Sequence, residues 1–381
     1  MIVLLMWPVV SALRLRCRCR YDGSNFHGVQ KNIRTQDGTE LRTILSALEQ
    51  SLWPALKQQV KFHVASRTDA GVSASGQVVV MNVPVLDVDE GESLFVNVHG
   101  VAVHISALAD AFNACLPADL QMTEVGPVPD KFDVGRDSRW KRYRYRLPPC
   151  LPADDDDDGM RVLRMVASHA ARAARHRLAE LEDGSLTSSP PRRASRRRRA
   201  LPSPAITNVA AMEDAAALLE GTHDFAAFTA RGGDQKGTVR TIFRCAIEPR
   251  NGCADSVSVD EASGAGEMDA YDIVVEGDGF LYKQVRIVAG TLLMVGMGLV
   301  PPETILIALS SDEREGGPLG DRDKSGKPMS KGQLRSLGVV GPTLPPERLC
   351  LEHIEYDRDH MRLEGAGPRQ SRTHCKTEHA P

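Results

Sequence analysis

The chain has 381 residues and a formal net charge of −3; 42% of its residues are hydrophobic and 25% are charged. This length is enough for two domains, and the composition is ordinary for a soluble globular protein. The eight cysteines show no C-x-x-C spacing, so neither a zinc site nor a disulfide framework is indicated, and a reducing compartment fits best.

In the first part of the chain, basic residues alternate with mostly apolar ones. Residues 1–11 are mostly apolar, too short to cross a membrane, and lack the basic start of a secretory signal. The four arginines before Asp22 would suit a mitochondrial presequence. We favour a first β-strand, because Arg14, Arg16, Arg18 and Arg20 alternate with Leu13, Leu15, Cys17, Cys19 and Tyr21. Residues 1–11 are then a short N-terminal extension, and the compartment stays open among mitochondrion, cytoplasm and nucleus.

The next elements follow from periodicity. Leucines and an isoleucine at helical spacing predict a helix over Thr39–Leu52, with Asp37 and Glu40 at capping-box spacing. Strands are predicted at Val60–Ala65 and Gln77–Val83, a polar insert follows, and a second helix is predicted near Ser106–Cys115. The order strand, helix, two strands, helix and strand is that of a ferredoxin-like α+β unit.

A small polar loop, 66–76, lies between the two predicted strands. Its two glycines permit a tight turn, and the lack of bulky side chains leaves room for a ligand beside Asp69. Arg67 is two positions away, so either residue could orient the other. On spacing alone, the preferred interpretation is a connecting turn in which Asp69 accepts hydrogen bonds from the backbone and Arg67 is solvated.

Residues Arg139–Arg146 form a strand pattern with tyrosines on one face and arginines on the other. Basic residues interleaved with aromatics suit nucleic acid, because cations neutralise phosphate and a ring can stack on a base. The pattern fits equally well with a charged outer face and a tyrosine core.

Residues 148–204 differ in composition from the rest of the chain. They contain five consecutive aspartates, a helical stretch near 160–181 and a basic run, Arg192–Arg199. We expect a low-complexity, mostly disordered insert, whose arginines could bind RNA or an acidic partner or simply be solvated. A second polar insert is expected over 251–269, and a polar tail over 363–381.

The second half contains an apolar helix pattern over Phe280–Val300, whose only charges are Lys283 and Arg286. A helix that is apolar on nearly all faces is buried, and a buried arginine needs an anionic partner. Asp69 is one candidate partner, and another core carboxylate is the alternative. Further elements are predicted as helices near 212–219 and 302–309 and strands at 271–277 and near the end of the chain.

Several segments resemble, in order, those of the TruA-type tRNA pseudouridine synthase family. Ser66–Ala74 resembles the family's Gly-Arg-Thr-Asp-Ala-Gly-Val-His-Ala, with Ser66 and Ser73 in place of glycine and histidine. The other matching segments are Tyr21–Gln30, Asp110–Leu120, Lys141–Tyr145, Gly221–Phe228, Phe280–Gly290 and Pro345–Tyr356. The segment from Leu281 to Arg286, with Val29, resembles the divergent eukaryotic branch of the family.

The resemblance implies two ferredoxin-like (RRM-like) α/β domains, 12–133 and 134–362, with joined antiparallel sheets and a basic cleft between them. It also implies isomerisation of uridine to pseudouridine in RNA, with tRNA as the expected substrate, no metal, no cofactor and no membrane partner. A homodimer is compatible with it.

The family's site residues carry over to four positions. Asp69 becomes the nucleophile, Tyr143 packs on the target uracil, Arg286 lies beside the aspartate, and Arg67 contacts RNA at the flipped nucleotide. Departures at Val29, Ser73 and Gly135 keep one alternative open, a catalytically impaired RNA-binding protein of the same fold.

Overall fold

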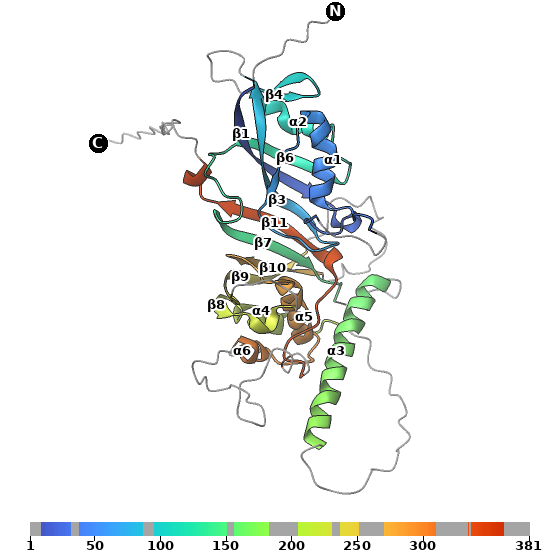
Figure 1. The fold of residues 1–381 in the computed structure, drawn as a ribbon. Helices are drawn as coiled ribbons and strands as arrows, with labels where there is room; N and C mark the ends of the chain where they lie inside the picture. The colour runs from blue at the N-terminus through green and yellow to red at the C-terminus, as the bar shows by residue number, and fades with distance from the viewer. Residues whose placement is uncertain are drawn as a thin grey trace, which may run out of the picture.

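The structure is a computed structural model that describes residues 9–31, 38–86, 95–150, 156–182, 205–230, 237–250, 270–309, 334 and 337–361. It has a mixed α+β fold built on one large, mostly antiparallel sheet (Figure 1). The strands of the first half are β1 (Val9–Tyr21), β2 (Phe62–Val64), β3 (Ser73–Leu86), β4 (Phe95–Val98), β5 (Val101–His104) and β6 (Leu120–Pro127). Those of the second half are β7 (Ser138–Arg146), β8 (Gly221–Asp224), β9 (Val239–Pro249), β10 (Tyr271–Gly277) and β11 (Leu349–Tyr356).

Helices accompany both halves of the sheet. They are α1 (Ile44–Leu56), α2 (Leu108–Asn113), α3 (Asp157–Glu182), α4 (Val209–Ala217), α5 (Gln284–Gly296) and α6 (Thr304–Leu309). Short 3₁₀ turns are η1 (Gly23–Asn25), η2 (Ile105–Ala107), η3 (Ala226–Phe228), η4 (Pro346–Arg348) and η5 (Asp359–Met361). Among the described helices, none is long and apolar enough to cross a bilayer.

The last strand, β11, joins the two halves of the sheet. It pairs in parallel with the start of β3, where Cys350 lies opposite Ser73, and antiparallel with β7, where Leu351 lies opposite Tyr143. Figure 1 shows β11 between these two strands. The loop that precedes β3 is therefore brought close to the middle of β7, although the two are far apart in sequence.

The predicted first strand is confirmed, and its core face is the one that alternation indicated. Leu15, Cys17 and Cys19 are fully buried. The strand begins earlier than expected, because Val9 pairs with Leu86 and Ser11 with Val85. The end of the segment expected as an extension therefore belongs to β1, and residues 1–8 lie outside the described part of the chain.

Helix α1 begins at Ile44, five residues later than predicted. Thr43 is its N-cap: its hydroxyl accepts from the Ser46 N–H at 3.1 Å, and the Ser46 hydroxyl accepts from the Thr43 N–H at 2.8 Å. The start assigned to Asp37 and Glu40 was therefore wrong, since a reciprocal cap further along the chain satisfies the first N–H groups. Asp37 itself lies outside the described residues.

Helix α3 occupies part of the segment over 148–204 that was expected to be mostly disordered. The predicted helical stretch is present and runs for 26 residues, with Val162, Leu163 and Val166 fully buried. These apolar side chains share one helix face, so α3 has a core face of its own, which packs beside α5. The run Arg192–Arg199, the insert over 251–269 and the tail over 363–381 lie outside the described residues.

Helix α5 is buried along its whole length, as its apolar pattern predicted. A chain segment crosses it closely: the Gly341 N–H donates to the Thr291 hydroxyl at 2.8 Å, and the Leu344 N–H donates to the Arg286 carbonyl at 3.3 Å. A Cβ at Gly341 would lie 2.3 Å from the Gly290 carbonyl carbon, so this crossing requires glycine. The segment brings Leu344 against the first turn of α5, where Arg286 lies.

Candidate active site

Asp69 and Arg286 meet across 217 positions of sequence. Asp69 lies in the loop before β3, and Arg286 lies in the first turn of α5. Arg286 Nη1 donates to Asp69 Oδ2 at 3.0 Å, and its Nε donates to the Leu344 carbonyl at 2.6 Å. The arginine side chain is 10% exposed and the aspartate side chain 26% exposed. The expected pairing is present, and it holds a carboxylate that solvent or a ligand can reach.

The loop that carries Asp69 is held against the turn that follows β1. The Val29 N–H donates to the Thr68 carbonyl at 3.2 Å, and the Gly71 N–H donates to the Phe26 carbonyl at 3.2 Å. Gly71 has a φ of +81°, a conformation that a side chain would strain. The backbone on both sides of Asp69 is thus fixed by backbone partners.

A buried glutamine, Gln77, holds the same loop from the other side. Its Nε2 donates to the Ser66 carbonyl at 2.8 Å, and its Oε1 accepts from the Ser66 N–H at 3.3 Å. Nε2 also lies 3.3 Å from the Tyr21 hydroxyl, which lies 2.8 Å from the Thr68 hydroxyl. Gln77 is fully buried. Its role could not be predicted from the sequence, since a lone glutamine beside an apolar run carries no recognisable signal.

Tyr143 lies in the middle of β7 and faces the Asp69 loop. Its hydroxyl lies 2.8 Å from the Ser66 hydroxyl, and its ring meets the Phe280 ring edge-on, with centroids 5.3 Å apart. Burial raises the pKa of Tyr143 to about 12, and the charge of Asp69 adds to the shift. The residue is only 7% exposed, so little of its ring is open to a base in this structure.

The loop is flanked by two further cations. Arg67 is exposed and forms no ion pair or hydrogen bond with a described residue, so it does not orient Asp69 here. Lys141 lies on β7 two residues before Tyr143, and its Nζ donates to the Ala65 carbonyl at 2.8 Å. Burial lowers the pKa of Lys141 to about 8.

For two arginines of β7, the structure favours one of the two interpretations that the pattern left open. Arg142 pairs with Glu276 at 2.8 Å. Arg144 lies 2.6 Å from a Glu352 oxygen and 3.0 Å from a Glu248 oxygen. These two arginines are committed to carboxylates of neighbouring strands and lie on the sheet face opposite Tyr143. For them the alternative of a charged outer face is correct, and phosphate binding is not supported.

The departures from the family pattern have structural roles here. Ser66 supplies the hydroxyl that meets Tyr143, and the Ser73 hydroxyl accepts from the Gly23 N–H at 3.0 Å. Val29 is fully buried. The Gly135 N–H donates to Asp133 Oδ1 at 3.0 Å and closes a turn before β7. None of the four removes Asp69, Tyr143 or Arg286.

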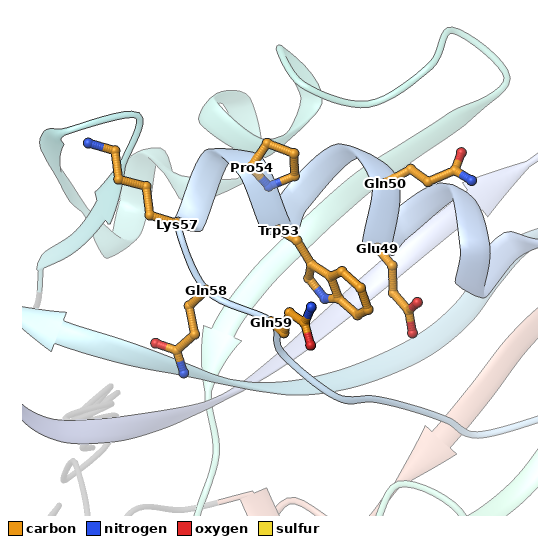
Figure 2. A pocket seen from close by; sticks show the side chains of 7 residues that line it. All are labelled: Glu49, Gln50, Trp53, Pro54, Lys57, Gln58 and Gln59. Carbon is orange, nitrogen blue, oxygen red and sulfur yellow. The ribbon is translucent and has the colours of Figure 1, made fainter.

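A hollow of about 310 Å³ lies elsewhere, at the end of α1 (Figure 2). It is lined by Glu49, Gln50, Trp53, Pro54, Lys57, Gln58 and Gln59. None of the four predicted site residues belongs to it, so it is distinct from the Asp69 site. In the part of the chain that the structure describes, no three His, Cys, Asp or Glu side chains converge as metal ligands would.

The chain is similar in sequence to known proteins that all carry one description, tRNA pseudouridine synthase. A sequence profile described as tRNA pseudouridine synthase matches residues 215–321, which include Arg286. The tRNA pseudouridine synthase A of Nitratidesulfovibrio vulgaris is 30% identical over 320 residues, covering 80% of this chain and 94% of that protein. The proteins of the same name from Myxococcus xanthus and Streptococcus pyogenes are 29% and 28% identical, cover 90% and 91% of this chain, and are themselves covered over 92% and 99% of their lengths.

Proposed function

The chain belongs to the TruA-type tRNA pseudouridine synthase family, and on that premise we propose that Asp69 is the nucleophile with which it isomerises uridine to pseudouridine in tRNA. The observation that carries the proposal is the contact between Asp69 and Arg286. Arg286 binds only Oδ2, and no residue in the described part of the chain donates to Oδ1. One carboxylate oxygen is therefore neutralised and fixed while the other is free to meet a nucleoside.

The reaction needs no net gain or loss of atoms. The bond between N1 of the base and C1′ of the ribose breaks, the base turns, and C5 bonds to C1′; the proton lost from C5 is balanced by one gained at N1. A positioned carboxylate nucleophile divides such a rearrangement into easier steps. The backbone and Gln77 bonds of the Asp69 loop supply the positioning, which is a major part of catalysis.

The remaining residues are assigned by their places around Asp69. The Tyr143 ring is proposed to meet the uracil ring, and the exposed Arg67 to contact the RNA beside the flipped nucleotide. Removal of a base from its stack costs a few kcal/mol, which such contacts offset. The two halves of the sheet are proposed to be ferredoxin-like domains with a basic cleft between them, and a homodimer remains a proposal.

The test is direct modification of tRNA. Purified protein is incubated with unmodified transcripts of several tRNAs, and pseudouridine is mapped chemically at single-nucleotide resolution. The proposal expects pseudouridine at defined positions. Binding of the transcripts without any pseudouridine would instead favour the impaired RNA-binding protein, and failure to bind would contradict both.

A further inference from the structure

Helix α3 has two faces of opposite character. Val162, Leu163, Val166 and Ala173 are 0–3% exposed. Four arginines of the same helix are exposed: Arg161, Arg164, Arg172 and Arg175. At about 100° per residue, these arginines fall within a sector of roughly 80° on the side opposite the buried residues. The helix therefore presents an outward arginine face, defined by these four residues.

No ion pair among the described residues neutralises the outward arginine face. None of its four arginines pairs with a carboxylate among the described residues, unlike Arg142 and Arg144 on β7, which do. Of the two acidic residues in the first turn of the helix, Asp158 pairs with Arg348 at 2.7 Å. From Arg161 to Arg175 the face extends about 21 Å at ~1.5 Å per residue. Within the described part of the chain, four guanidinium groups without an ion pair thus lie along one face of the helix.

The start of α3 lies close to the candidate active site. Its partner Arg348 belongs to η4, and Pro346 of the same turn packs on Gly71, two residues after Asp69. A Cβ at Gly71 would lie 2.9 Å from Pro346 Cγ. Figure 1 shows that α3 then runs beside α5 and past the end of the sheet. The first turn of the helix is thus anchored beside the Asp69 loop.

We propose that the outward arginine face of α3 binds the sugar–phosphate backbone of the tRNA, beyond the nucleotide that reaches Asp69. This inference rests on the proposed function. Guanidinium groups match phosphate oxygens in a bidentate way, and each neutralised phosphate releases counterions to solution. Because a tRNA is far larger than one nucleotide, a basic helix face beside the site gives it a second point of attachment.

An anionic membrane is the other polyanion to consider. A basic amphipathic helix binds a membrane surface by inserting its apolar face among the lipids. In α3 that face is covered by the protein: Val162 and Val166 are fully buried, and His169 Nε2 lies 3.1 Å from the Val340 carbonyl. Helix α3 therefore exposes its arginines but has no free apolar face to insert into a membrane. This favours an RNA backbone over a membrane as the ligand.

The test compares two charge-matched variants of the full chain. Arg164→Gln/Arg175→Gln removes half of the outward arginine face, and glutamine keeps a similar helix propensity. The control is Arg136→Gln/Arg358→Gln. Arg136 and Arg358 are exposed and adjoin the paired ends of β7 and β11, at the opposite end of β11 from Arg348. Binding is measured for an unmodified tRNA transcript over a range of salt concentrations.

The α3 variant should bind the transcript about 10- to 30-fold more weakly near ~0.15 M salt, and the slope of log K against log salt should flatten by about 1.4–1.8. The control should bind as the wild type does. Equal affinity and slope for both variants would overturn the proposal. So would unchanged tRNA binding with lost binding to phosphatidylcholine–phosphatidylserine vesicles, which would assign the face to a membrane.

Failure of the proposed function would look different. In that case the wild-type protein would form no pseudouridine, whatever the dependence of transcript binding on α3. An unchanged circular dichroism spectrum and melting temperature in the α3 variant, expected for exposed side chains, separates lost contacts from lost folding.

Discussion

The hydroxyl oxygens of Ser66 and Tyr143 lie 2.8 Å apart and join the Asp69 loop to the centre of the sheet. A glycine at position 66, which the family resemblance would place there, has no atom that could make this bond. The serine therefore fixes the Tyr143 phenol from the loop side, while Phe280 fixes its ring edge-on from the other. Ser66 and Tyr143, which come from separate halves of the chain, are thus held in a fixed orientation relative to each other.

This bond predicts coupled stability effects. Ser66→Gly and Tyr143→Phe should each lower the free energy of unfolding through loss of the same hydrogen bond, worth about 1 kcal/mol. The double variant should lose less than the sum of the two, with a coupling energy of about 0.5–1.5 kcal/mol in denaturant unfolding. Strictly additive effects would mean that the two hydroxyls do not support one another.

The same pair predicts a split in activity. Tyr143→Phe keeps the ring beside Asp69 and should retain most pseudouridine formation, whereas Tyr143→Ala removes the ring and should lose it. The comparison is made at saturating tRNA, with circular dichroism as the check of folding. A fully active alanine variant would return Tyr143 to a purely structural role.

Gln77 is expected to act as a positioning residue. Gln77→Leu keeps the side-chain size but leaves the Ser66 N–H and carbonyl without their partners, at a cost of about 2–4 kcal/mol. A displaced loop should also lower the rate constant by about 100-fold, since small misplacements are that costly. tRNA affinity should stay near the wild-type value. The exposed Gln59→Leu is the control, and equal rates for the two variants would contradict the role.

The packed face of α3 predicts that this part of the 148–204 segment contributes to stability. A disordered segment over 148–204 would tolerate replacement of residues 154–203 by a flexible linker. The buried Val166 instead predicts that Val166→Asp destabilises the protein by about 3 kcal/mol or more, because it buries an unpaired charge. Ala171→Asp, on the exposed side of the helix, is the control. Similar melting temperatures for both variants would restore the disordered interpretation.

Lys141 gives the stability a measurable pH dependence. Burial lowers its pKa from 10.5 to about 8, so between these values the unfolded chain binds more protons than the folded protein. The contribution of Lys141 to the free energy of unfolding should therefore rise with pH across this window, by about 2–3 kcal/mol. The difference between wild type and Lys141→Met isolates this term from the tyrosines. A difference that stays constant from pH 7.5 to about 10 would contradict it.

Strand and helix patterns predicted much of the fold because burial follows periodicity. The alternation in β1 predicted its buried face, and the mostly apolar pattern over Phe280–Val300 predicted a buried helix, which the structure has as Gln284–Gly296. For β7, the tyrosine core was one of two interpretations that the pattern left open. The start of α1 was predicted too early, because two polar pairs, Asp37 with Glu40 and Thr43 with Ser46, have capping-box spacing within a few residues. Only the local backbone conformation decides which pair caps the helix. The helical stretch of α3 was predicted, but the charged runs around it concealed that its apolar side chains pack against the rest of the protein.

Site residues could be predicted from the sequence where the burial of a side chain requires one particular kind of partner. A buried arginine requires an anion, and the family resemblance supplied Asp69. Arg142 and Arg144 could not be placed, because their partners Glu276, Glu248 and Glu352 come from strands whose order no local pattern reveals. Gln77 binds backbone atoms eleven residues away, so only the folded chain shows its role.

The central claim is that the Asp69 carboxylate, held by Arg286, performs the isomerisation. Asp69→Asn keeps the size and shape of the side chain and removes only its charge, and the exposed Asp110→Asn serves as the matched control. Pseudouridine formation is followed in a single turnover with excess protein over a tRNA transcript, and binding is measured in parallel. We expect the Asp69→Asn protein to bind the transcript and form no pseudouridine, while Asp110→Asn behaves as the wild type. Pseudouridine formed by the Asp69→Asn protein at the wild-type rate would contradict the account.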